Sequence, residues 1–307
     1  MSETEGIAQS SYPEVDVYLR SSDDIDFPTL RAFLAFASPV LKTQLTLPVP
    51  SLDVKDGLPV LRTTQSSRTL GHLIPLLYPI SSPDPPLETL SDVRAVLIAA
   101  SHYRMDRVLK QIEYWLKTTS LVNQDPVGVF SVAIRFNLRD AAIAAAKSSL
   151  RLPLFGRPYQ PEFENISAGD IYRLQEFHTK CTAGIRAAAL GGSILISGLS
   201  LGQYKWITRD SFVWFTCTAC ATSFQPIAIS GGRSVQTRRW WIIYMHELAS
   251  ALAESPCSDT LLKPNTMEKA IDGADPCDVC RRRVVYDMKD FHEMLLTEIN
   301  RVMDDVR

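Results

Sequence analysis

The sequence predicts an α/β domain, with a three-stranded sheet and helical hairpins, followed by a mainly α-helical domain. Three observations lead to this prediction. Apolar and polar residues alternate from Val15 to Arg20, which is typical of a half-buried strand. Apolar residues then recur at helical spacing through much of the chain. Two CxxC pairs in the second half, Cys217/Cys220 and Cys277/Cys280, indicate a site that joins distant segments.

Turn residues and prolines divide the first half into short elements. An Asp-rich turn at 21–24 separates two short strands, which we expect to form a hairpin. Pro28 is expected to open a helix, and Ser38-Pro39 to end it and begin another, because Ser is a good N-cap and Pro suits the first helical position. After a Pro-containing loop at 47–57, a third strand is expected at an edge of the sheet because it contains Pro59. The expected strands are 15–20, 25–27 and 58–62, and further helices are expected from Ser66 or Ser67, from Ser91 and from Asp106.

This order of elements, together with several short motifs, resembles a known family. The residues "ASPVLK" lie at the joint of the first helical hairpin, and "LLYP" and "AASHYRM" follow later in the chain. On these residues, 15–119 is identified as a BTB/POZ domain. The segments "PVLRTTQSS" and "VFSVAIRFNL" are most similar to BTB proteins of basidiomycete fungi, in which a cysteine-containing region follows the domain. The resemblance implies a non-catalytic protein–protein interaction module that self-associates as a homodimer and recruits partner proteins.

The resemblance also assigns roles to single residues. Asp16 matches an acidic residue at the start of the first strand, and Arg31 matches the basic residue that pairs with it across a groove, while Thr29 stands where the family usually has His. This pair is either part of a partner-binding groove or a paired core charge, since buried charges need partners. Cullin-binding members carry a hydrophobic-x-Glu motif after the second helix, and here that place, Leu45–Pro50, has no acid. A substrate adaptor of a cullin-type ubiquitin ligase is therefore the alternative function.

Caps and prolines predict the domain organisation. Residues 1–14 are expected to be a disordered tail, and 15–119 the BTB/POZ domain. Asp125-Pro126 starts a helix in a helical extension over 120–150, and the proline-containing stretch 151–165 is the expected linker. Ser167 and Asp170, spaced as in a capping box, begin the mainly helical C-terminal domain at 166–307.

Composition and charge exclude several classes of protein. The 307-residue chain has a net charge of −2, so it lacks the general basic excess of proteins that bind nucleic acid or anionic membranes. It shows no apolar run long enough for a transmembrane helix and no secretory signal. We therefore expect an intracellular protein, in the nucleus or the cytoplasm. In a reducing compartment its six cysteines are better interpreted as thiols or metal ligands than as disulfides.

The two CxxC pairs are the strongest chemical signal in the sequence. Each CxxC turn lets two thiolates bind one ion, and two such turns complete a tetrahedral zinc site with four sulfur ligands. The predicted ligands of this structural zinc are Cys217, Cys220, Cys277 and Cys280. The 56 residues between the pairs exceed the gap of a compact zinc ribbon, so the metal would join the two ends of a helical subdomain.

Four other side chains remain open as ligands. Cys257 and His246 are substitutes for one of the four. His178 and Cys181 lie one helical turn apart, a spacing that can hold a metal. Cys181 also lies in an apolar helical stripe, which favours plain packing for this pair.

A zinc enzyme is the alternative from another class. Pro276-Cys277-Asp278-Val279-Cys280 matches half of the zinc deaminase signature. The other half, His-x-Glu or Cys-x-Glu, is missing, because His246-Glu247 and His292-Glu293 are adjacent pairs. Four thiolates would also leave no open position for water on the metal. The sequence therefore predicts a protein that is not an enzyme.

A basic cluster accompanies the second CxxC pair. It consists of Arg281-Arg282-Arg283, with Arg238-Arg239 nearer the first pair. One interpretation is contact with nucleic acid or nuclear import. The other, which the slightly negative net charge favours, is a solvated face whose charge stabilises the thiolates.

Overall fold

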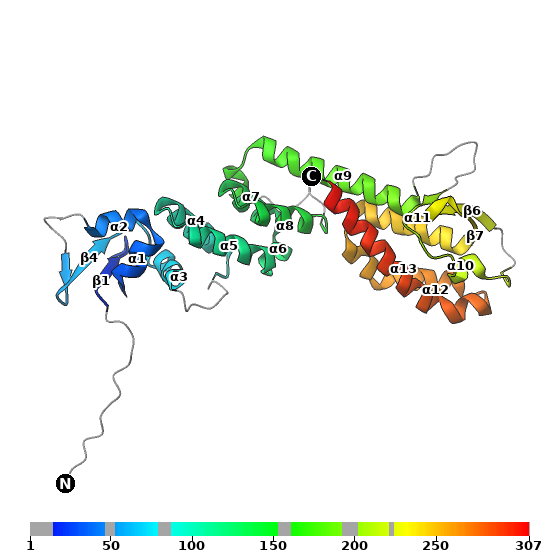
Figure 1. Cartoon of the computed structure of the whole chain (residues 1–307), viewed down its shortest axis with the longest axis horizontal. Coiled ribbons are helices and arrows are strands. Elements are labelled where there is room, and N and C mark those ends of the chain that lie inside the picture. Colours follow the sequence, from blue (N-terminus) through cyan, green and yellow to red (C-terminus); the bar gives the residue numbers. More distant parts are fainter. Residues whose placement is uncertain are drawn as a thin grey trace, which may run out of the picture. The chain divides into compact units, whose positions relative to one another are not determined.

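The computed structural model describes residues 15–46, 53–78, 87–152, 161–191, 202–220 and 224–306. The chain divides into two compact units, whose elements are labelled in Figure 1. One comprises Met1–Ala145 with Glu162–Asn165, and the other comprises Ala146–Pro161 with Ile166–Arg307. No helix within the described ranges is long and apolar enough to cross a bilayer. The domain boundaries expected from the sequence stay a prediction.

The first unit is built on a mixed four-stranded sheet. Its strand order is β2-β1-β4-β3, in which β1 is antiparallel to β2 and parallel to β4, and β4 is antiparallel to β3. Val17 and Leu19 of β1 are buried, as the alternation of the sequence indicates. The strands are β1 Val17–Arg20, β2 Asp26–Thr29, β3 Asp53–Lys55 and β4 Leu58–Arg62.

The expected three-stranded sheet is wrong by one strand. Strand β3 lies in the stretch expected to be a loop, and all three of its residues are exposed, so it lacks the alternation that marks a half-buried strand. Strand β4 is not at the edge either, because it lies between β1 and β3. Its pairing with β1 begins at Val60, one residue after Pro59, so the missing N–H of Pro59 falls outside that ladder.

Side chains that accept from free backbone N–H groups set the starts of several helices. Ser38 Oγ accepts from the Leu41 N–H at 3.0 Å, as expected of a cap of α2, and donates to the Tyr103 carbonyl at 2.5 Å. Asp125 likewise accepts from the Gly128 N–H at 3.1 Å at the start of α7. The helices up to the second unit are α1 Arg31–Ala37, α2 Pro39–Thr46, α3 Ser67–Leu77, α4 Leu90–His102, α5 Asp106–Thr118, α6 Leu121–Gln124, α7 Pro126–Arg135, α8 Arg139–Ser149 and the 3-10 helix Pro161–Asn165.

Helix α1 begins later than the sequence predicts. Pro28 lies in β2, opposite Tyr18, and the helix begins at Arg31. The Asp16 carboxylate accepts from the backbone N–H of Arg31 at 2.7 Å. Among the ion pairs within the described ranges, none joins Asp16 to the Arg31 guanidinium. The charged pair that the resemblance assigns to these residues is thus replaced by a contact that caps α1.

Ion pairs join all four strands of the first sheet. Asp26 lies 2.6 Å from Arg20 and 2.9 Å from Lys55, while Asp53 lies 3.1 Å from Arg20 and 2.8 Å from Arg62. The hydrogen bond from Arg20 is the main reason that the pKa of Asp26 lies well below its usual range. Isolated surface pairs stabilise little, but this shared network favours the observed strand register.

The second unit combines helices with a small sheet. Helix α9 packs against α11 and α13, and α12 packs against the same two helices. The three strands have the order β5-β6-β7, with β5 parallel to β6 and β6 antiparallel to β7. The elements are α9 Ala168–Leu190, β5 Gln203–Tyr204, α10 Val213–Thr216, β6 Phe224–Ile229, the 3-10 helix Ser230–Gly232, β7 Ser234–Arg238, α11 Arg239–Glu254, the 3-10 helix Ser258–Leu262, α12 Pro264–Ala274 and α13 Asp278–Asp305.

The second unit is mainly helical, and its small sheet is the part that the sequence did not predict. Strands β6 and β7 flank Gly231 and Gly232, both with φ of +72°, so the two glycines form the turn of a hairpin. Pro226 lies within β6, and this interruption hides the strand from sequence reasoning. The expected capping box of Ser167 and Asp170 is confirmed at the start of α9.

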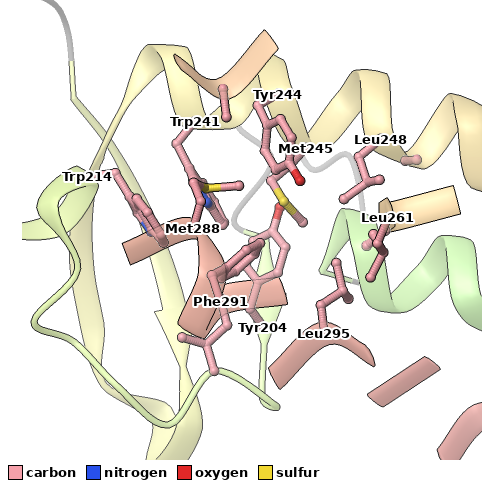
Figure 2. Close-up of a cluster of buried hydrophobic side chains, with 14 of the residues drawn as sticks. Tyr204, Trp214, Trp241, Tyr244, Met245, Leu248, Leu261, Met288, Phe291 and Leu295 are labelled. Atoms are coloured by element: carbon pink, nitrogen blue, oxygen red, sulfur yellow. The ribbon is translucent and has the colours of Figure 1, made fainter. Parts of the chain in front are cut away.

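Aromatic side chains fill the core of the second unit (Figure 2). Trp214 stacks on Trp241 of α11, with ring centroids 6.1 Å apart and planes 12° apart. Phe291 of α13 meets both rings edge-on, at 5.3 and 5.8 Å. Such edge-on and stacked pairs add to the free energy gained from burial alone. The aromatic-dense segment before the first CxxC pair is therefore part of the core that joins α11 and α13.

A buried histidine and tyrosine lie in the same core. The Tyr244 hydroxyl and His292 Nε2 are 2.6 Å apart and hydrogen bonded, and His292 is only 7% exposed. Burial disfavours the charged imidazolium and lowers the pKa of His292 to about 4. Between about pH 6.5 and 4 the unfolded chain therefore binds a proton that the folded chain does not. The stability that His292 contributes is present above that window and is lost as the pH falls through it.

The substitution His292→Gln removes this titration and keeps a polar partner for Tyr244. We expect the loss of unfolding free energy between pH 6.5 and 4 to shrink by about 3 kcal/mol. Tryptophan fluorescence in urea, with a chelator present, measures this in the second unit, which holds four of the five tryptophans. The control is His246→Gln, which replaces an exposed histidine and should lose as much unfolding free energy between pH 6.5 and 4 as the wild type. The same loss in His292→Gln would contradict the role assigned to His292.

Candidate metal centre

The two CxxC pairs lie at the ends of helices that the core holds together. Cys217 directly follows α10, and its backbone N–H donates to the Val213 carbonyl at 2.9 Å. Cys277 is the N-cap residue of α13, and Cys280 lies in the first turn of that helix. Helix α10 contacts α13. The first pair is thereby placed beside the second, although 56 residues separate them.

The distances between the four sulfur atoms are close to those around a tetrahedrally coordinated ion. Cys217 Sγ lies 3.7 Å from both Cys220 Sγ and Cys277 Sγ, and Cys220 Sγ lies 3.4 Å from Cys280 Sγ. All four atoms lie within 4.8 Å of one another. A tetrahedron with zinc–sulfur bonds of about 2.3 Å has sulfur–sulfur edges of about 3.8 Å. The cluster could therefore bind one metal ion without a large rearrangement.

Burial and hydrogen bonding act on the thiols in opposite directions. Cys217 and Cys280 are buried, and Cys220 and Cys277 are half-buried. Burial opposes ionisation of Cys217, but hydrogen bonds from the backbone N–H groups of Ala219 and Cys220 and from the thiols of Cys280 and Cys220 together outweigh it and lower its pKa to about 7. Burial raises the pKa of Cys220 to about 11 and also raises that of Cys280. Without a cation, the cluster thus disfavours several thiolates at once, and a bound cation would reverse this.

The four side chains left open as ligands lie outside the cluster. Cys257 contacts Thr260, and Cys181 is buried in the core. His178 Nε2 is hydrogen bonded to Ser149 at 2.6 Å, and His246 is exposed on α11. Among the residues that the structure describes, the four CxxC cysteines form the only group of three or more potential ligands. The preference for packing over metal binding at His178 and Cys181 agrees with this arrangement.

The first unit, with its mixed sheet and helical hairpins, is similar to a known domain family. Residues 8–120 match the BTB/POZ domain family. This domain is generally a non-catalytic module for protein–protein interaction. None of the curated proteins compared with the chain matches it. The resemblance to BTB proteins of basidiomycete fungi, and to their cysteine-containing region, therefore stays a prediction.

The adjacent His-Glu pairs lie outside the cysteine cluster, and two of their side chains make other contacts. His292 is bonded to Tyr244 in the core, and Glu247 forms an ion pair with Lys269 at 2.9 Å. Neither His246 nor His292 joins the cysteine cluster. An ion held by all four thiols would have no position for a reactive water. The cysteine cluster after the BTB/POZ domain thus suits a structural ion.

The arginines beside the second CxxC pair are largely engaged in local contacts. Arg281 lies 2.8 Å from Asp278, and Arg283 lies 3.2 Å from Asp287. Arg238 is buried, so it offers no exposed charge. These contacts favour the interpretation of a locally compensated face over a nucleic-acid surface.

Sequence reasoning missed Asp287, which is 4% exposed. Its Oδ2 accepts from the Val213 N–H at 2.6 Å and so reaches the element that carries the first CxxC pair. The signal was present, because Asp287 lies among Val284, Met288 and Phe291 on the inward face of α13. A carboxylate in that stripe is a buried charge, and a buried charge needs a partner.

The geometry predicts which disulfides form when metal-free protein is oxidised. The Cys217 thiol, whose pKa is lowered, should react first with mild peroxide, and Cys220 and Cys277 both lie 3.7 Å from its sulfur. Mass spectrometry of the digested protein should therefore recover, besides the disulfide within the first CxxC pair, a peptide containing Cys217 linked to one containing Cys277. Cys181 and Cys257, both buried outside the cluster, serve as internal controls and should remain reduced. Disulfides confined to each CxxC pair would contradict the observed juxtaposition.

Proposed function

We propose that this chain is a non-catalytic interaction protein that self-associates and recruits partner proteins through its BTB/POZ domain. The observation that carries the proposal is the match of residues 8–120 to that domain, on a unit with the described sheet and helical hairpins. The fold class alone does not name a partner. The expected location inside the cell, in nucleus or cytoplasm, stays a prediction.

A hollow on the first unit supports partner recruitment. It has a volume of about 550 Å³. One side is formed by the joint of α1 and α2, and the other side by the joint of α4 and α5. Phe36, which lines it, is 75% exposed, and Arg104, Asp106 and Arg107 place charges of both signs around it. The hydrogen bond from Ser38 to the Tyr103 carbonyl ties the two helix joints together. A hollow with an exposed aromatic side chain is a suitable place for a partner segment.

The second part of the proposal is that zinc closes the second unit. Four soft sulfur ligands in a near-tetrahedral arrangement suit zinc better than magnesium or calcium, which prefer oxygen. Cys217, Cys220, Cys277 and Cys280 would then all be ligands. The ion would link the start of α13 to the end of α10 and so stabilise the packing of both against the aromatic core.

A substrate adaptor of a cullin-type ubiquitin ligase remains the alternative within the binding proteins. The absence of an acid in Leu45–Pro50 counts against it. Affinity purification of the tagged chain, followed by mass spectrometry, separates the two functions. A recovered cullin would establish the adaptor, whereas repeated purifications without one would favour a self-associating scaffold.

Metal analysis tests the zinc site directly. Purified protein should contain about one zinc per chain, and substitution of Cys280 by Ser should lower the zinc content several-fold, because three thiolates bind more weakly than four. The matched control is Cys257→Ser, which removes a buried thiol outside the cluster and should retain the metal. A fully folded wild-type protein without any metal would exclude the site.

Light scattering tests self-association. At micromolar concentration the chain should have about twice the mass of one chain, which is 34.3 kDa, because BTB/POZ domains often form twofold dimers. A mass that stays at that of one chain as the concentration is raised would exclude the homodimer. The Cys280→Ser variant should remain dimeric, since its substitution lies in the other unit.

A further inference from the structure

The first CxxC pair follows a helix that has no side-chain acceptor at its own N-cap position. Helix α10 has four residues, and its N-cap residue is Phe212, whose side chain offers no acceptor. The acceptor comes instead from α13, where Asp287 Oδ2 lies 2.6 Å from the Val213 N–H in a buried setting. An interaction between two distant segments thus replaces a local cap.

The same residue, Val213, connects Asp287 to the candidate ligand Cys217. The N–H of Val213 donates to Asp287, and the carbonyl of Val213 accepts from the Cys217 N–H at 2.9 Å. One residue therefore joins the carboxylate on α13 to the backbone of the first cysteine. Any shift of Val213 relative to α13 would move Cys217 as well.

A second contact holds the chain just before α10. Arg283 Nη2 donates to the Ser211 carbonyl at 3.1 Å and lies 3.2 Å from Asp287 Oδ2. Cys280, Arg283 and Asp287 are spaced three and four residues apart, so they lie on one face of α13. Two turns of this helix thus carry a metal ligand and both side chains that hold the segment leading to Cys217.

We infer that Asp287, supported by Arg283, is a positioning residue that sets the metal affinity of the cysteine cluster. This inference deepens the proposed zinc site and rests on it. Asp287 does not touch the sulfur atoms; it holds Cys217 at its place beside Cys277 before the ion arrives. Without this contact the four thiols are still present, but residues 211–217 must become ordered when zinc binds. The entropy lost in that ordering weakens zinc binding. Residues that orient metal ligands change affinity by roughly 10–100-fold when they are lost.

The test compares zinc affinity with stability in the metal-free state. Competition with a chromogenic chelator at 25 °C should show Asp287→Ala binding zinc about 10–100-fold more weakly than wild type. Asp287→Asn keeps an oxygen that can accept from the Val213 N–H and should lose less than about tenfold. Asp304→Ala, on the same helix, removes the ion pair with Lys147 and should bind zinc like wild type.

The outcomes separate a positioning role from a purely structural one. A structural role would lower the unfolding free energy of the metal-free protein and leave zinc affinity unchanged, because affinity is measured on folded protein. Wild-type affinity in Asp287→Ala would therefore overturn the inference. If that variant does not fold, Arg283→Met decides instead, with weaker binding expected and wild-type affinity overturning the inference. Failure of the wild type itself to bind zinc would instead remove the proposed site.

Discussion

The second unit depends on the contact between α10 and α13. Helix α13 begins at one CxxC pair, and α10 ends at the other, so the place where these helices meet decides whether the four sulfur atoms converge. Aromatic packing of Trp214 against Phe291 holds the two segments together. The buried hydrogen bond from the Val213 N–H to Asp287 sets their relative position along the helix. Non-directional burial and a directional hydrogen bond thus act on the same few residues.

In the first unit, one serine serves both local and tertiary structure. Ser38 caps α2 and donates to the Tyr103 carbonyl at the joint of α4 and α5. The short motif that carries the family resemblance is therefore also the point where two helical hairpins are joined. The adjacent hollow is lined by residues of both joints, among them Pro39 and Arg104. The hydrogen bond from Ser38 therefore links the two sides of that hollow.

Local signals made much of this fold predictable from the sequence. The caps at Ser38, Asp125 and Ser167, together with the helical stripe of α13, depend on neighbouring residues alone. Exposed β3 and the β6–β7 hairpin were missed because their stability comes from pairing partners outside their own stretch. The four cysteines could be named from their spacing, but Asp287 required knowledge of what lies opposite it. Residues far apart in the sequence come together only in the tertiary structure, and no local sequence pattern predicts which of them will be in contact.

The 56 residues between the two CxxC pairs have a consequence for synthesis of the chain. The first pair leaves the ribosome before β6, β7, α11 and α12, and its partners arrive only with the last helix. A compact knuckle can capture its ion during translation, whereas here the long loop must close first. If the cluster binds zinc as proposed, Cys217 and Cys220 would remain free thiols until α13 packs against α10. Metal uptake at this cluster would consequently report that the whole second unit has been completed and folded.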